Sequence, residues 1–173
     1  MKFGKNLTKL STALGFVALS AAASAGSTTP INMAVTLTTV ANCSVAATGI
    51  SFGTVLTPIV NNVSSTGGQI TVNCSAGSPT ISLGLAATST TGNTVAARKL
   101  ASGANSAVYL NYNLFTNSTL SQLWGDGTLG TSTVAAAADG TSHNYPVFGI
   151  LPGGQTNGIQ GAYTDTVSVV VNF

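Results

Sequence analysis

The sequence predicts an all-β sandwich. Apolar residues alternate with polar ones in several short runs, and clusters of Gly, Asn, Ser and Pro separate these runs. In addition, no stretch after residue 26 sustains the 3.6-residue periodicity of an amphipathic helix. Short strands at near-regular spacing, with turn signals between them, are typical of two packed antiparallel sheets. We find no internal repeat and no linker, so we expect one domain.

The predicted strands are spread along the whole chain after residue 30. The first run, 31–40, places Ile31, Met33, Val35 and Leu37 on one face. Further runs lie at 50–55, at 69–74 after a predicted turn at 64–68, at 80–87, at 107–116 and at 146–151. The last run begins near Thr164 and places on one face Val167, Val169, Val171 and Phe173. Residues 133–140 are predicted as a loop or an edge strand.

The first 25 residues have the pattern of a cleaved secretory signal peptide. Three lysines precede an apolar stretch around residues 14–19, and Ala23-Ser24-Ala25 gives a small-x-small cleavage site. The apolar stretch is too short to span a membrane, and no later segment approaches 18 uninterrupted apolar residues. We therefore expect export without membrane insertion.

The remaining 148 residues, 173 less the first 25, carry almost no charge. Arg98 and Lys99 are their basic residues, and Asp126, Asp139 and Asp165 are their acids, which gives a net charge of −1. A basic patch for nucleic acid or anionic lipid is absent, so neither is expected as a partner. This low charge has two compatible interpretations. The protein is normally part of an assembly, or it has an extracellular surface whose polarity comes from Ser, Thr, Asn and Gly.

Cys43 and Cys74 are the only cysteines. In an exported chain, two thiols most simply form one structural disulfide. The closed loop of about 30 residues would stabilise the fold by roughly 3–4 kcal/mol. The spacing is not the C-x-x-C of a redox pair, and a zinc site would need His or Cys ligands that the sequence lacks. We predict a disulfide and no metal site.

No group of residues points to catalysis or to a cofactor. The stretch 125–130 satisfies G-x-G-x-x-G, but it lies in no βαβ unit and is predicted to be a turn. His143 is the sole histidine, and the three aspartates lie at predicted turns or at a strand start. These residues supply neither a triad nor a pair of carboxylates in contrasting environments. We expect neither an enzyme nor a cofactor-binding protein.

Two alternating runs have no evident partner strand. One, 31–38, directly follows the signal peptide, and the other ends at Phe173 with no turn after it. An isolated apolar strand is not stable in water. The first run can fold back into its own sandwich, or it can add to a sheet of a neighbouring molecule by β-augmentation. Burying its four apolar side chains yields a gross gain of roughly 6–12 kcal/mol in either case, so both arrangements stay open.

Three blocks of the sequence, 108–128, 145–155 and 161–173, contain distinctive motifs. The most specific of these are the turn Trp124-Gly125-Asp126-Gly127, the motif Pro-Val-x-Gly and the ending Gly-x-Tyr-x-Asp-Thr-Val. In combination they resemble the spore coat protein U domain family, which includes the Csu-type subunits of archaic chaperone–usher pili. The resemblance extends to the signal peptide, the run at 31–40 and the cysteine pair, so it covers essentially the whole chain.

This resemblance implies an incomplete immunoglobulin-like β-sandwich that lacks its last strand. In such families a periplasmic chaperone lends a strand, and an outer-membrane usher then exchanges it for the N-terminal extension of the next subunit. On this chain, 26–38 would be the extension with 28–38 as the donor strand, 39–173 the pilin domain, and 164–173 one border of the acceptor groove. The implied role is a structural pilus subunit at the cell surface, supporting adhesion and biofilm formation. The implied partners are other pilin subunits, the chaperone and the usher.

Two other functions remain open at this point. A self-complete secreted β-sandwich would serve as a coat or matrix protein, and it would stay monomeric without a chaperone. A tip adhesin would usually need a second, receptor-binding domain, for which the chain lacks the length. Exposed aromatic residues in a loop would favour an adhesin, and Trp124 is the one candidate in the sequence.

Overall fold

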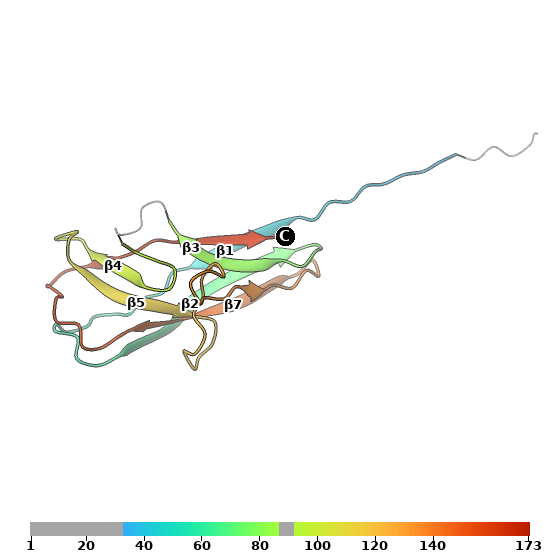
Figure 1. Ribbon diagram of the computed structural model, residues 1–173. Coiled ribbons are helices and arrows are strands. Elements are labelled where there is room, and N and C mark those ends of the chain that lie inside the picture. The colour runs from blue at the N-terminus through green and yellow to red at the C-terminus, as the bar shows by residue number, and fades with distance from the viewer. Residues whose placement is uncertain (1–32, 87–91) are drawn as a thin grey trace, which may run out of the picture. The chain divides into compact units, whose positions relative to one another are not determined.

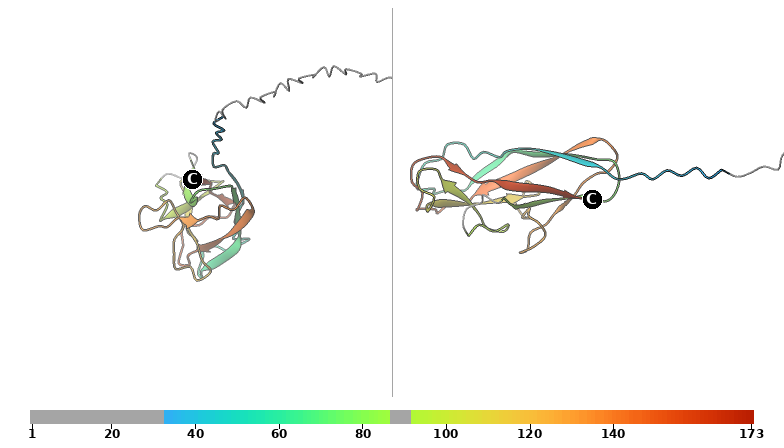
Figure 2. Two further views of the ribbon diagram at one scale, coloured as in Figure 1. Left: turned by 90° about the vertical axis from the view of Figure 1, so that its right-hand side faces the viewer. Right: turned by 90° about the horizontal axis from the view of Figure 1, so that it is seen from above.

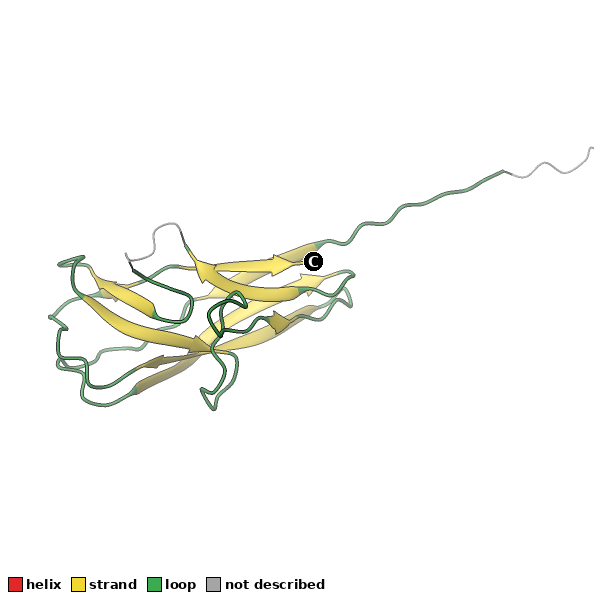
Figure 3. Cartoon of the chain, in the orientation of Figure 1, coloured by secondary structure: helices red, strands yellow, loops and turns green. Residues whose placement is uncertain are grey.

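The computed structural model describes residues 33–86 and 92–173, which form strands and loops (Figures 1 and 3). Within this part of the chain no helix has the length and hydrophobicity to cross a membrane. Residues Thr38–Phe173 form one compact unit. The predicted signal peptide and Ile31 lie outside the described residues. The strands are β1 (Cys43–Thr48), β2 (Val63–Cys74), β3 (Thr80–Leu85), β4 (Arg98–Ser102), β5 (Tyr109–Phe115), β6 (Val134–Ala135), β7 (Ser142–Leu151), β8 (Tyr163–Thr164) and β9 (Val167–Asn172).

These strands form two sheets, as the sequence predicts. One sheet has six strands in the order β1-β2-β7-β5-β4-β8, and the other has three in the order β6-β3-β9. Every ladder between two strands is antiparallel. Buried apolar side chains from both sheets form a single core, which includes Ile70, Val72, Ile81, Leu83, Leu110, Leu114 and Val147. The all-β sandwich is confirmed.

The prediction of a strand at 50–55 was wrong, because the strand lies earlier, at Cys43–Thr48. The ladder of β1 with β2 ends at the pair Thr48–Gln69. Just beyond this pair, β2 shifts register between Ser65 and Gly68. The main-chain donors and acceptors along its edge are then no longer regularly spaced for a ladder. Gly53 adopts a φ of +71°, which also takes the chain out of an extended conformation.

The predicted turn at 64–68 was also wrong, since these residues belong to β2. The two glycines that suggested a turn lie at the register shift instead. A Cβ atom at Gly68 would lie 3.1 Å from the Cβ of Val147 and 3.2 Å from that of Ile50. Glycine is therefore required here by a close approach, not by a reversal of the chain.

The last predicted run divides into two strands that belong to different sheets. β8 pairs with β4 in the six-stranded sheet, and β9 pairs with β3 in the three-stranded sheet. The chain crosses between the sheets at Asp165 and Thr166. β4 itself was not predicted, because the run Arg98-Lys99 interrupts the apolar alternation.

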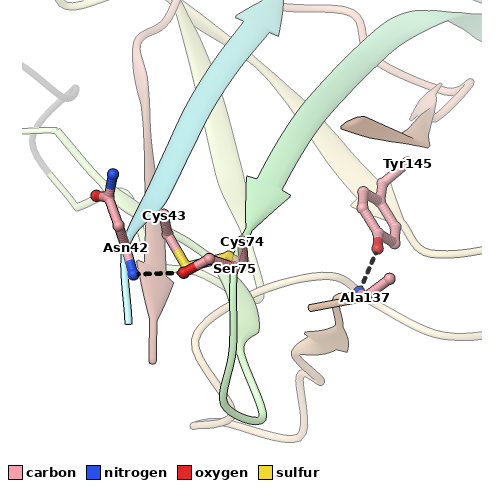
Figure 4. Close-up of a disulfide and its surroundings, with 6 residues drawn as sticks. All are labelled: Asn42, Cys43, Cys74, Ser75, Ala137 and Tyr145. Atoms are coloured by element: carbon pink, nitrogen blue, oxygen red, sulfur yellow. Dashed lines mark hydrogen bonds between the residues drawn. A yellow bond between two sulfur atoms is a disulfide. The ribbon is translucent and has the colours of Figure 1, made fainter. Parts of the chain in front are cut away.

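The disulfide between Cys43 and Cys74 is confirmed (Figure 4). The two cysteines are directly opposite each other in the β1–β2 ladder, with their Cα atoms 4.2 Å apart. Next to them, the amide of Asn42 donates to the hydroxyl of Ser75, and the amide of Ser75 donates to the carbonyl of Asn42, both at 3.0 Å. The start of the edge strand β1 is therefore fixed to the sheet covalently and by hydrogen bonds.

We predict that replacing both cysteines, Cys43→Ser with Cys74→Ser, lowers the free energy of unfolding by about 3–4 kcal/mol, because the unfolded chain regains the freedom of the closed loop. Protease resistance and the yield of exported protein measure this loss. Treating the unaltered protein with a reductant is the matched control and should give the same loss. Unchanged yield and protease resistance in the double variant would contradict a structural disulfide.

Candidate functional site

An open apolar groove runs along one side of the sandwich, with a volume of about 1100 Å³. This exceeds the roughly 300–1,000 Å³ of most small-molecule pockets. One wall is the end of β1 with the irregular segment 49–57, and the other is formed by residues 159–167 and Val169. The floor consists of core side chains, namely Ile59, Ile70, Leu83, Leu100, Leu110, Tyr112, Leu114, Val147 and Leu151. The groove is therefore a place where the core itself is open.

The two walls include one free edge of each sheet, that of β1 and that of β9. β1 is the first strand of the six-stranded sheet, and β9 is the last strand of the three-stranded sheet. Each pairs along one edge only, β1 with β2 and β9 with β3, and no strand of the described part pairs with the other edge. Unpaired main-chain N–H and C=O groups on such edges are a template for a further strand. The geometry suits an extended peptide better than a compact ligand.

The irregular wall, 49–57, is held in place by its own apolar side chains. The side chains of Ile50 and Phe52 cover Gly149, where a Cβ atom would lie 2.7 Å from the Cδ1 of Ile50 and 3.0 Å from the Cζ of Phe52. The ring of Phe52 packs edge-on against that of Tyr112, with 6.1 Å between the ring centroids. The hydroxyl of Ser65 donates to the carbonyl of Ser51 at 2.6 Å. The wall is thus ordered without belonging to a ladder.

Asp165 is the one charged residue that lines the groove among the described residues. Its Oδ2 accepts a hydrogen bond from the hydroxyl of Tyr112 at 2.6 Å and another from the side-chain amide of Asn93 at 3.1 Å. Its Oδ1 is buried and has no hydrogen-bond partner. Burial, followed by the hydrogen bond to Asp165, raises the pKa of Tyr112 well above its usual value. This phenol therefore stays protonated as a donor to the carboxylate.

Arg98 is fully buried and contacts Leu83 of the groove floor. Its guanidinium donates to the carbonyl of Leu83 at 2.7 Å and to that of Gly84 at 3.3 Å, which joins β4 of one sheet to β3 of the other. Burial lowers the pKa of Arg98, while the nearby Tyr112 and Asp165 act in the opposite direction. The sequence interpretation treated Asp165 as an ordinary strand-edge residue. That was wrong, because this carboxylate belongs to a buried polar cluster with Arg98, Tyr112 and Asn93.

The structure places the predicted acceptor residues of β9 in different surroundings. The side chains of Val167 and Val169 line the groove. Val171 packs against the core farther along the strand, opposite Ile81 of β3. Phe173 follows the end of β9 and is 62% exposed. The three valines face inward, as the alternation in the sequence predicts. The role of Phe173 in the groove stays a prediction.

The described residues of the predicted donor strand have no regular secondary structure. The exposed fractions are 84% for Met33, 83% for Val35 and 86% for Leu37. Three large apolar side chains at alternate positions are thus in contact with water. Their assignment as a donor strand stays a prediction at this point.

The turn at Trp124-Gly125-Asp126-Gly127 has a structural role. Trp124 is 1% exposed and donates from its indole nitrogen to the carbonyl of Ile81 at 3.2 Å, so it cannot serve as an exposed contact of an adhesin. A Cβ atom at Gly125 would lie 2.3 Å from the Oγ1 of Thr131, which requires glycine. Asp126 accepts from the amide and hydroxyl of Thr128, and these bonds lower its pKa. The prediction of a turn at 125–130 is confirmed.

The remaining titratable residues in the described part of the chain form no second site. On the surface, Nε2 of His143 lies 2.9 Å from Oδ2 of Asp139. Hydrogen bonds from the amide and hydroxyl of Thr141, and then from His143, lower the pKa of Asp139 to about 2. Across residues 33–86 and 92–173, no group of three or more His, Cys, Asp or Glu side chains is placed to hold a metal ion.

Comparison with known protein families gives a match between residues 29–170 and the model of the spore coat protein U domain. The chain belongs to the spore coat protein U domain family. The matched residues include all strands of both sheets up to Val170 of β9, together with every residue that lines the groove. No curated protein sequence matches the chain significantly.

Among solved structures, this spore coat protein U domain is similar to a chain in the crystal structure of the CsuC–CsuE chaperone–tip adhesion subunit pre-assembly complex, from the archaic chaperone–usher Csu pili of Acinetobacter baumannii. The TM-score is 0.51 and the sequence identity is 24%. The match covers 79% of the present chain and 41% of the other, so this chain spans less than half the length of that one. The likeness supports a shared fold.

We predict that Tyr112→Phe destabilises the domain by about 1–3 kcal/mol, because Oδ2 of Asp165 loses its shorter hydrogen bond while it stays buried. Tyr109→Phe is the matched control, since this neighbouring phenol lies outside the Asp165 cluster. Urea denaturation of the two variants checks the difference. Equal stability of both variants would show that the cluster contributes little.

Proposed function

We propose that this chain is the structural subunit of a bacterial surface pilus, assembled by the chaperone–usher route through donor-strand complementation. The observation that carries the proposal is the open groove between two free sheet edges. In this proposal the alternating segment 28–38 of a second copy, or of a related subunit, enters the groove and pairs with both edges. The core then becomes continuous, and the chain of such contacts forms the fibre.

The chemistry of the two surfaces supports this pairing. The groove floor is apolar, and the segment offers Ile31, Met33, Val35 and Leu37 on one face. Covering these side chains provides a gross gain of roughly 6–12 kcal/mol, before the cost of ordering the segment. Membership in the spore coat protein U domain family and the fold shared with a pilus subunit complex support the same function.

The proposal includes the route and the partners. The chain is exported to the periplasm, where a chaperone occupies the groove until an outer-membrane usher adds the subunit to the fibre. The finished fibre lies at the cell surface and supports adhesion and biofilm formation. Catalysis forms no part of this role.

The experiment that tests this function places a charge on either face of the donor segment. We predict that Val35→Asp abolishes fibres while the subunit still accumulates with its chaperone, because a carboxylate would be buried without a partner. Thr36→Asp is the matched control, since its side chain points away from the groove, and this variant should still build fibres. Electron microscopy of cells and chaperone pull-down provide the readouts. Normal fibres from the Val35→Asp variant would rule out the donor assignment.

A further inference from the structure

The groove contains one polar position that an inserted strand must satisfy. Oδ1 of Asp165 is buried at the groove wall without a hydrogen-bond partner, although its Oδ2 has two. A buried carboxylate oxygen without a partner is costly, so native structures usually supply one. The part of the chain that the structure describes contains none for this atom. Because the atom belongs to a residue that lines the groove, an inserted strand can provide the donor.

The alternation of the two strands restricts what can lie opposite Asp165. In β9 the odd-numbered residues from Val167 to Val171 face the core, and Asp165, two residues before β9, lines the same groove as Val167 and Val169. In the donor segment the apolar residues also have odd numbers. Side chains directly opposite each other in a ladder lie on the same face, so an odd donor residue opposes Asp165 if the inserted strand continues its pairing two residues before the start of β9. Among the odd positions from 29 to 41, the side chains with a hydrogen-bond donor are Thr29 and Thr39.

Each threonine corresponds to one direction of the inserted strand. If the strand runs antiparallel to β9, Thr39 opposes Asp165 and four apolar pairs follow: Leu37–Val167, Val35–Val169, Met33–Val171 and Ile31–Phe173. If it runs parallel to β9, Thr29 opposes Asp165, and the same four apolar residues pair in the reverse order. All other registers that put an odd-numbered donor residue opposite Asp165 are less favourable. They either place an apolar residue opposite the carboxylate or move most of the apolar residues away from β9.

Proline and the chain path decide between the two directions. In the parallel register, Pro30 would lie opposite Thr166, inside the groove, where it can donate no ladder hydrogen bond. In the antiparallel register, Pro30 falls beyond the end of β9 and outside the ladder. Antiparallel pairing also agrees with every ladder between strands of this fold.

The position of β1 connects these directions to two different occupants. Cys43 pairs with Cys74, and Asn172 pairs with Thr80, and only residues 75–79 separate the two partners. β1 therefore begins at the end of the domain where β9 finishes (Figure 1; Figure 2, right panel). A segment folded back from its own β1 would have to run parallel to β9. A segment from a second copy can run antiparallel and leave at the opposite end, which permits head-to-tail growth.

We propose that Thr39 of the incoming subunit donates its hydroxyl to Oδ1 of Asp165, and that this hydrogen bond sets the register of the donor strand. The inference rests on the proposed donor-strand function and adds a residue four positions before Cys43 to the contact. Asp165 is a specificity-determining residue in this scheme: it accepts strands with a hydroxyl at this position and penalises those with an apolar side chain there.

The test measures how fast purified fibres release subunits in guanidinium chloride. Thr39→Val keeps the size and shape of the side chain but removes the donor, and it should speed release about tenfold or more, since a hydrogen bond to a charged group is lost. Thr39→Ser should restore a rate near that of the unaltered fibre. Thr38→Val, on the outward face, is the matched control and should change the rate less than about twofold.

A double-variant comparison separates a direct contact from a general loss of stability. In fibres of Asp165→Ala, the additional change Thr39→Val should have little effect on release, because the acceptor is absent. If Thr39→Val fibres dissociate at the unaltered rate, or if Thr29→Val is the change that speeds release, the proposed register is overturned. If the unaltered chain forms no fibres at all, the proposed function itself fails, and this outcome is distinct from the other two.

Discussion

The free edges of β1 and β9 face each other across a core that the described strands do not cover, and this constraint explains the other features of the fold. Both edges carry main-chain groups without ladder partners, while the floor between them is made of Leu110, Leu114 and other core side chains. An extended strand can pair with an edge and cover the floor with every second side chain. A compact ligand can cover the floor, but it cannot pair with the main-chain groups of a strand edge. The shape of the groove therefore favours a strand.

The walls of the groove are fixed at opposite ends, which keeps it ready for a strand. β1 is attached at its start by the Cys43–Cys74 disulfide, beside the end of β9. β9 begins just after Asp165, which the hydrogen bonds from Tyr112 and Asn93 hold in place. Arg98 joins the two sheets beneath the groove through the carbonyls of Leu83 and Gly84. A preorganised groove lowers the ordering cost of binding, and most of that cost then falls on the inserted segment.

The sequence predicted those parts of the fold in which side-chain alternation is regular. β3, β5 and the inward face of β9 follow directly from period-2 patterns, and the cysteine pair follows from composition and export. β4 was missed because Arg98 is a buried charge, and burial of a charge depends on tertiary partners that no local pattern shows. The strand at 50–55 was misplaced because Ile50 and Phe52 are apolar for packing over Gly149, not for a ladder. The hydrogen bonds of Asp165 in the groove were missed for a similar reason. Their donors, Tyr112 and Asn93, lie 53 and 72 residues away in the sequence.

A cross-link between the donor segment and the groove wall directly tests whether a neighbouring molecule fills the groove. Val35→Cys and Val169→Cys are introduced together into the full chain, in which Cys43 and Cys74 are already joined, and fibres are oxidised before denaturing electrophoresis without reductant. Filling of the groove by the next copy predicts a ladder of covalent multimers, because residue 35 of one copy lies opposite residue 169 of the next. Either single change alone should leave monomers. A covalently closed monomer would contradict the filling of the groove by a neighbouring molecule, and fibres without any cross-link would contradict the proposed register of the inserted strand.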